Sequence, residues 1–329
     1  MSNPFMTQVE LPSAPGLIAH GRPIMTIGTC FADEIGTRLH DDLFDVTVNP
    51  FGALYNPASI LRAFRLMDES PEIDCDELID GHGLWHSLDF HSRFSLPSRR
   101  QLAESLTGHL RRLHASLPGL QTVIITLGSA KAFRHNASGR VAANCHKLPA
   151  SEFTLTDISE EETAAALGAI LEILRRHNPG VSVIVTISPV RHKAYGYHAD
   201  RLSKARLLLG ADRFCRLEPE AATYFPAYEI LNDELRDYRF YADDMTHPAT
   251  SAVNHIYGCF ARSFFSDETA ALAAYARKTV LRLRHRPLNP ATADCERAAA
   301  VEAARQFAER YPAVGRPLGE IVSTFYITS

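Results

Sequence analysis

The sequence lacks several features that would assign a protein to a class at once. No apolar run approaches the ~18 residues of a membrane span, so no segment is expected to cross a bilayer. The 6 cysteines are scattered without a CxxC pair, which argues against a zinc ribbon or a disulfide framework. Residues 1–5 do not have the basic-then-apolar layout of a secretory signal. A reduced, cytoplasmic setting with free thiols is therefore expected.

Signals for nucleic acids and cofactors are also missing. The net charge is −4, and no Lys/Arg-rich run alternates with aromatic residues, so no nucleic-acid partner is expected. There is no GxGxxG after a strand and no P-loop, so no nucleotide cofactor is expected. Cys145 and His146 are neighbours and would need ligands from elsewhere in the chain, so no metal site is expected either.

What the sequence does contain is a set of short runs rich in β-branched residues, separated by longer segments of helical period. Near-continuous apolar strands of this kind are typical of a parallel sheet covered by helices on both faces. The sequence therefore predicts an α/β fold. The expected strands are residues 24–28, 45–48, 123–128 and 181–189.

The clearest helix is expected over residues 159–177. Ser159 and Glu162 stand at capping-box spacing, and an Asn-Pro-Gly sequence after residue 177 stops the helix just before an expected strand. Such a helix-to-strand step is typical of an α/β sheet. Further helices are expected over residues 202–209 and 251–264.

These elements predict one α/β domain over residues 1–265. Residues 266–329 are richer in Ala and Arg and are expected to form a helical C-terminal extension with a turn around residues 287–290. The extension is expected to pack either on the core or on a partner, so a homo-oligomer is one open alternative.

The most informative segment for function is residues 24–36, IMTIGTCFADEIG. It predicts a short strand, a turn at Gly28 and a helix whose first residue is Cys30. Backbone N–H groups and the helix dipole favour an anion at this position, so a nucleophilic thiolate is expected there. Much later in the chain, Asp244 and His247 offer a base and a carboxylate that orients it. The other cysteines are expected to be inert, as small buried hydrophobes.

The polar segments that follow the expected strands predict a single crevice. Ligands of open α/β sheets bind at the carboxyl ends of the strands. Four polar or glycine-bearing segments are expected there, and a fifth, from Asp244 to His247, lies in a loop that leads into a helix. The four segments are residues 28–30, 49–52, 128–131 and 188–191.

At these same positions the sequence resembles the GSCFA family, which is grouped with the SGNH/GDSL hydrolases. The resemblance covers most of residues 24–260. Its motifs are GTCFA at residues 28–32, NPFG at 49–52, VAANCHKLP at 141–149, SPVRH at 188–192 and YRFYADDMTHP at 238–248. It implies a three-layer α/β/α sandwich with a mainly parallel, flavodoxin-like sheet.

The resemblance also implies roles for individual residues. Alignment with the Gly-Asp-Ser block of SGNH enzymes puts Cys30 at the position of the nucleophilic serine and Thr29 at that of the aspartate. Asp244 and His247 then match the Asp-x-x-His block, with His247 as the base and Asp244 fixing its tautomer. The N–H groups of Cys30 and Gly52 would donate to an oxyanion.

The sequence departs from the SGNH pattern in the third block, which carries an oxyanion-donating asparagine in those enzymes. Here the corresponding stretch is residues 128–131, GSAK, and it has no asparagine. Asn144 or His146 is expected to take that place. Ser129, His91 and Arg191 complete the expected substrate-binding residues, with Arg191 able to hold an anionic group.

The resulting prediction is an SGNH-like hydrolase of the esterase or amidase type. It would act through a Cys nucleophile and a covalent acyl-thioester on a small-molecule or glycan acyl substrate, without a cofactor. Two alternatives stay open. One is an acyltransferase that moves the acyl group to a sugar or amine. The other is a non-catalytic module that binds a ligand in the same crevice.

Overall fold

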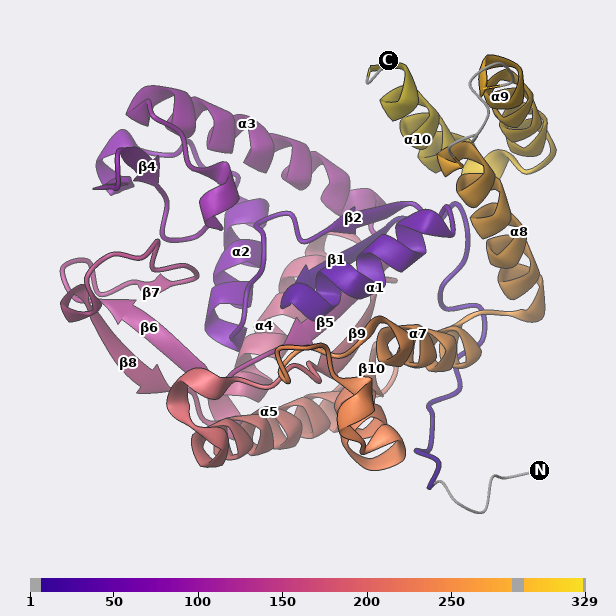
Figure 1. Cartoon of the computed structure of the whole chain (residues 1–329). Helices are drawn as coiled ribbons and strands as arrows, with labels where there is room; N and C mark the ends of the chain where they lie inside the picture. The colour runs from indigo at the N-terminus through magenta and orange to yellow at the C-terminus, as the bar shows by residue number, and fades with distance from the viewer. Residues whose placement is uncertain (1–6, 286–292, 328–329) are drawn as a thin grey trace.

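A five-stranded parallel sheet forms the centre of the protein, as the computed structural model shows for residues 7–285 and 293–327 (Figure 1). Every pairing within it is parallel. Helices lie on both faces, so the predicted α/β fold with a mainly parallel sheet is confirmed. The strand order is β10 (Ala222–Phe225), β9 (Ser182–Ile187), β5 (Thr122–Leu127), β1 (Ile24–Gly28) and β2 (Val46–Val48).

The strand order fixes where a ligand is expected to bind. Taken in chain order, the five strands are arranged 2-1-3-4-5, which is the flavodoxin-like order. The chain leaves β1 toward β2 on one side and then crosses to β5 on the other side. Ligands of such sheets bind at this switch point, between the carboxyl ends of β1 and β5, and Cys30 directly follows the turn at the end of β1.

Alternating side chains of the strands divide the core into two layers. Met25 and Ile27 join the apolar cluster under one set of helices, whereas Ile24 joins the cluster on the opposite face. The first face is covered by α2 (Pro57–Glu69), α3 (Arg99–Ser116), α4 (Glu160–His177) and α5 (Tyr197–Leu217). The second is covered by α1 (Cys30–Asp41) and α7 (Thr250–Phe264).

Local signals located some helices well and others incompletely. The capping box between Ser159 and Glu162 is formed at the start of α4, as expected. α7 agrees with the expected helix 251–264 to within one residue. α5 is much longer than the expected 202–209, because buried polar residues such as Asp200 and Lys204 interrupt its apolar stripe.

Several short elements have little sequence signal of their own. β10 is a four-residue edge strand that was not among the expected strands. Two small antiparallel sheets add β3 (Ile79–Gly81) with β4 (Leu84–His86), and β6 (Lys131–His135) with β7 (Val141–Ala142) and β8 (Phe153–Asp157). The remaining short helices are η1 (Cys75–Glu77), η2 (Ser92–Phe94), η3 (Leu117–Gly119), η4 (Ala150–Glu152), η5 (Lys193–Tyr195), α6 (Ala227–Glu229), the π-helix η6 (Ile230–Leu235), η7 (Tyr238–Phe240) and η8 (Pro312–Val314).

The C-terminal extension is helical, as expected. It consists of α8 (Asp267–Arg284), α9 (Ala293–Arg310) and α10 (Gly315–Ile327), which share an apolar cluster that also includes Leu43 of the core. Arg277 of α8 donates to both carboxylate oxygens of the buried Asp42, at 2.7 and 2.6 Å. The extension therefore packs on the core. The turn expected around residues 287–290 lies outside the described residues.

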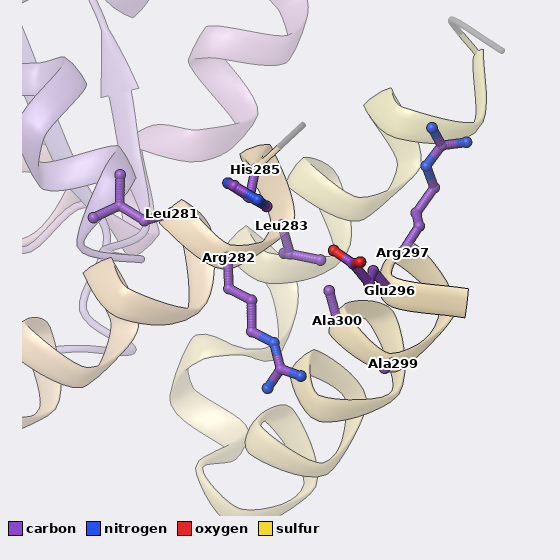
Figure 2. A pocket seen from close by; sticks show the side chains of 8 residues that line it. All are labelled: Leu281, Arg282, Leu283, His285, Glu296, Arg297, Ala299 and Ala300. Carbon is purple, nitrogen blue, oxygen red and sulfur yellow. The ribbon is translucent and has the colours of Figure 1, made fainter. Parts of the chain in front are cut away.

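A hollow of about 430 Å³ lies where the end of α8 meets the start of α9, and Figure 2 shows the side chains of Leu283 and Ala300 pointing toward one another there. It is lined only by residues of the extension, so it is separate from the sheet edge that carries Cys30. None of the helices within the described ranges combines the length and apolarity needed to cross a bilayer.

Substitutions at two glycines, one in each helix, can test the packing of α4 against α5. A Cβ on Gly210 would lie 2.5 Å from Cβ of Thr163, whereas a Cβ on Gly168 would meet nothing within 4 Å. We expect Gly210→Ala to lower the free energy of unfolding by about 1–3 kcal/mol, because the helices must separate. Gly168→Ala should raise it by up to about 1 kcal/mol, since alanine favours a helix. Urea denaturation of both variants measures these changes, and equal effects would contradict the helix contact.

Candidate active site

The turn that carries Cys30 accepts only glycine at its start. Gly28 ends β1 with φ +143°, and a Cβ there would lie 2.1 Å from the carbonyl oxygen of Thr126 in β5. The hydroxyl of Thr29 accepts a hydrogen bond from the N–H of Phe31 at 3.2 Å and so caps α1. Cys30 follows as the first residue of the helix and is half-buried. The expected strand, turn and helix are thus all present.

The electrostatic surroundings of Cys30 differ from the expectation. Burial raises the pKa of the Cys30 thiol, and the nearby Asp33 carboxylate raises it further. The N–H groups of Phe31 and Cys30 lower the pKa, but burial and the acidic residues outweigh them. The expectation of a thiolate stabilised by the helix N-terminus is therefore wrong. The group rests as a thiol at neutral pH and needs a base to become a nucleophile.

A buried asparagine holds this turn in place. The Oδ1 of Asn49 accepts the N–H of Gly28 at 2.8 Å, and its Nδ2 donates to the carbonyl of Thr29 at 3.2 Å. Asn49 is fully buried and adopts a left-handed conformation with φ +40°, which asparagine tolerates better than most residues. The Asn-Pro-Phe-Gly motif was among the motifs found in the sequence, but nothing in the sequence indicated that Asn49 holds this turn.

Gly52 was predicted to donate its N–H to an oxyanion, and the structure corrects this. Its N–H donates to the Asn49 carbonyl at 2.8 Å, so the donor is already used. Gly52 has φ +81°, and a Cβ there would lie 2.2 Å from Cβ of His91. Its function is to make a tight turn against His91. His91 in turn caps η2, with its Nδ1 accepting from the N–H of Arg93 at 3.2 Å.

Asp244 and His247 form the pair that the spacing predicts. The Asp244 Oδ2 lies 2.5 Å from the His247 Nδ1, and its Oδ1 accepts the N–H groups of Thr246 and His247 at 2.8 and 2.9 Å. These bonds hold the pKa of Asp244 well below its usual range. The carboxylate keeps the proton on Nδ1, which leaves Nε2 of His247 as the basic atom. Both side chains are about half exposed, so a ligand can reach them.

The loop with His247 lies at the same edge of the sheet as Cys30. Arg191, which follows β9, donates its N–H to the carbonyl of Thr246 at 3.1 Å and its guanidinium to that of Met245 at 3.3 Å. These bonds tie the loop to the carboxyl end of a central strand. They also assign Arg191 a positioning role that the sequence did not suggest.

The packing of α7 on α1 agrees with this placement. Arg38 of α1 bonds to Asn254 of α7, and one turn further along both helices Tyr257 donates to Asp42. The two helices therefore run in the same direction (Figure 1), and the residues just before α7 lie level with the start of α1. No hydrogen bond joins the Cys30 thiol to His247 within the described part of the chain.

A cavity of about 310 Å³ opens beside this edge. Two of the predicted residues line it. Ser129 is buried, with its hydroxyl accepting the N–H of Lys131 at 3.0 Å. Asn144 accepts the N–H of His146 at 2.8 Å through its Oδ1, so its Nδ2 is the group left to donate to a ligand. The full lining is Tyr55, Asn56, Ser129, Lys131, Phe133, Ala142, Ala143, Asn144, Cys145, His192 and Tyr195.

His146 does not fit its predicted role as an oxyanion donor. It is buried, its Nε2 lies 2.8 Å from the Ser87 carbonyl, and its Nδ1 lies 2.9 Å from the Ser92 hydroxyl. Because a carbonyl only accepts, the proton is on Nε2, and both ring nitrogens are used within the protein. Burial lowers the pKa of His146 to about 4, so the ring is neutral at pH 7. This histidine supports the loop that carries Asn144.

A buried lysine beneath the carboxyl ends of β5 and β9 is a feature that sequence reasoning missed. The Nζ of Lys204 donates to the carbonyls of Gly128 and Ser188 at 2.7 and 2.8 Å, just beyond the ends of β5 and β9. Burial lowers its pKa to about 8, and a thiolate at Cys30 would raise it. Lys204 thus connects two strand ends and supplies positive charge near the thiol. Its only sequence signal is a lysine in an apolar helical stripe.

Comparison with known proteins places the chain in a family. The profile of the GSCFA family matches residues 23–260, and the chain belongs to this family. The matched region contains every predicted site residue, and α8–α10 lie beyond it. A search of curated protein sequences found no match.

Among solved structures, the chain is similar to an acetyl xylan esterase, Est2A, from the rumen bacterium Butyrivibrio proteoclasticus. The two sequences are 12% identical, and the TM-score is 0.37. The match covers 80% of this chain and 65% of the esterase chain. A likeness this weak says nothing about what this chain binds.

The buried neutral His146 predicts a pH dependence of stability. The unfolded chain binds a proton at this residue near pH ~6.5, whereas the folded chain does so only near pH about 4. The unfolded state therefore gains protons first as the pH falls. We expect the free energy of unfolding to decrease from pH ~6.5 to ~4, by up to about 3 kcal/mol.

Denaturation of the wild type and of His146→Gln across this pH range measures the contribution. The variant should be less stable at neutral pH and should lose less stability on acidification. Parallel pH profiles for the two proteins would contradict the assignment.

Proposed function

We propose that this protein is an acyl-transferring enzyme of the hydrolase type, with Cys30 as nucleophile, His247 as base and Asp244 as the residue that orients the base. The observation that carries the proposal is the Asp244–His247 pair at 2.5 Å, held at the sheet edge where Cys30 begins α1. Membership of the GSCFA family supports it.

The reaction begins with proton transfer. Since the pKa of the Cys30 thiol is raised, His247 Nε2 takes its proton as the sulfur attacks the carbonyl carbon of the substrate. The new S–C bond leaves the electron pair on the carbonyl oxygen. Asp244 stabilises the imidazolium that forms. When the intermediate collapses, His247 returns the proton to the leaving alcohol or amine, and a thioester remains on Cys30.

The carbonyl oxygen needs donors while it is charged. The N–H of Cys30 lies in the first turn of α1, where backbone N–H groups have no partner within the helix. Asn144 is the second donor in this proposal, through its free Nδ2 at the neighbouring cavity. Gly52 is excluded from this role because its N–H is already bonded.

The thioester is then released by a second nucleophile. Attack by water gives an esterase or amidase, which is the activity we propose. Thioesters also react readily with other nucleophiles, so a sugar or amine acceptor would make the protein an acyltransferase. If the thiol does not react at all, the chain is a ligand-binding module that retains the crevice.

Intact mass spectrometry after incubation with 4-nitrophenyl acetate tests the nucleophile. We expect an added acetyl group on the wild type and none on Cys30→Ala. Cys295→Ser, which changes an exposed cysteine of α9, should acylate like the wild type. Labelling that persists in Cys30→Ala, or is absent in every protein, would overturn the proposal. Added sugars or amines then distinguish transfer from hydrolysis.

The roles of the base and of the second oxyanion donor are tested by rate. We expect His247→Gln to slow acylation by about 10²–10⁴-fold, because the thiol loses its proton acceptor. The loss should shrink as the pH is raised and the thiol ionises on its own. Asn144→Ala should slow acylation by about 10²–10³-fold at every pH, through loss of a donor. An unchanged rate in Asn144→Ala would end the assignment of that residue.

A further inference from the structure

A second cavity lies next to the loop that carries His247. Its volume is about 210 Å³, which suits a single small group. Three arginines line it, Arg191 after β9, Arg201 in α5 and Arg236 at the end of η6. The remaining lining residues are Leu231, Asn232, Tyr238 and Tyr241.

None of these three arginines forms an ion pair with a carboxylate among the described residues. The guanidinium of Arg191 donates to a carbonyl and lies over the rings of Tyr197 and Tyr241, at 4.3 and 5.5 Å from their centroids. Arg201 donates to the hydroxyl of Tyr228. Three positive charges around one small space repel one another unless an anion lies between them.

A second arginine-lined hollow provides a contrast within the same chain. In that hollow, Arg140 pairs with both Glu77 and Asp89, and Arg62 lies 3.6 Å from Asp89. Two of the four arginines in that lining are thus paired with carboxylates of the same hollow, whereas Arg65 and Arg134 form no ion pair within the described residues. The cavity beside Arg191 has no such acidic residue in its lining.

The backbone at Arg236 is consistent with a ligand-binding position. Arg236 has φ +50° and closes the π-helix, with its N–H donating to the Leu231 carbonyl at 3.0 Å. A left-handed conformation at a residue other than glycine is costly, and π-helices are rare. Both features are enriched at functional sites. Here they present an arginine side chain to the cavity.

We propose that this cavity binds the phosphate group of an anionic acyl donor. Guanidinium groups bind phosphate oxygens in a planar, bidentate manner, and the phenols of Tyr238 and Tyr241 are further donors. Arg191 contacts the cavity and also holds the carbonyls of Met245 and Thr246, so a bound phosphate sits directly behind the His247 loop. The proposal rests on the proposed acyl chemistry and names its substrate class.

Calorimetric titration with inorganic phosphate at low ionic strength tests the site itself. We expect saturable binding that Arg236→Gln and Arg201→Gln each weaken by about tenfold or more. Arg239→Gln is the matched control, because Arg239 is exposed in the neighbouring η7 and lies 3.5 Å from Asp237. Cys30→Ala should bind phosphate like the wild type. Absence of binding, or equal weakening by the control, would overturn the site.

Acylation kinetics then separate a substrate phosphate from free phosphate. Acetyl phosphate carries the phosphate next to the acyl group, and S-acetyl phosphopantetheine carries it at the end of a flexible arm. We expect Arg236→Gln to raise the KM of at least one of these donors by about tenfold and to leave the rate with neutral 4-nitrophenyl acetate unchanged. Inorganic phosphate should compete with the same donor.

Equal effects on charged and neutral donors, or no effect on any, would overturn the assignment to the substrate. Phosphate binding without acylation by any donor would overturn the proposed function instead, and would leave the phosphate site as an independent one.

Discussion

The candidate site depends on one buried amide. Asn49 bonds to Gly28 on one side and to Thr29 on the other, and its own carbonyl accepts the N–H of Gly52. The side chain of a residue that follows β2 thus fixes the turn between β1 and α1. The side-chain amide of Asn49 is buried, and both its oxygen and its nitrogen are hydrogen-bonded. Replacing Asn49 by an apolar residue would therefore leave the N–H of Gly28 and the carbonyl of Thr29 without these partners. The position of Cys30 at the first turn of α1 follows from this constraint.

Electrostatics at the sheet edge oppose a resting thiolate. A helix N-terminus by itself favours an anion, but Asp33 lies in the same first turn and the thiol is half-buried. Lys204 provides positive charge nearby, although its ammonium group donates hydrogen bonds to two carbonyls at the strand ends. A nucleophile that stays protonated until a base accepts its proton is consistent with a histidine held by a carboxylate rather than with a preformed ion pair.

Sequence patterns predicted the fold well where the signal was local. β1, β9 and α4 were found from apolar runs and a capping box, since both depend on neighbours in the chain. β10 was missed because a four-residue edge strand is defined by pairing with β9 and not by its own composition. Within the site, the spacing of Asp244 and His247 sufficed, whereas the hydrogen bonds of His146 and the close packing of Gly52 against His91 depend on residues distant in sequence.

By itself, the sequence determined the main buried strands, the glycine turn before Cys30 and the Asp-x-x-His pair, because each follows from residue types a few positions apart. Only the tertiary structure decided which N–H groups stay free, how the thiol titrates, and that three arginines from separate segments surround one cavity. Hydrogen-bond partners, burial and charge depend on what the folded chain brings together, and one-dimensional patterns carry little of that information.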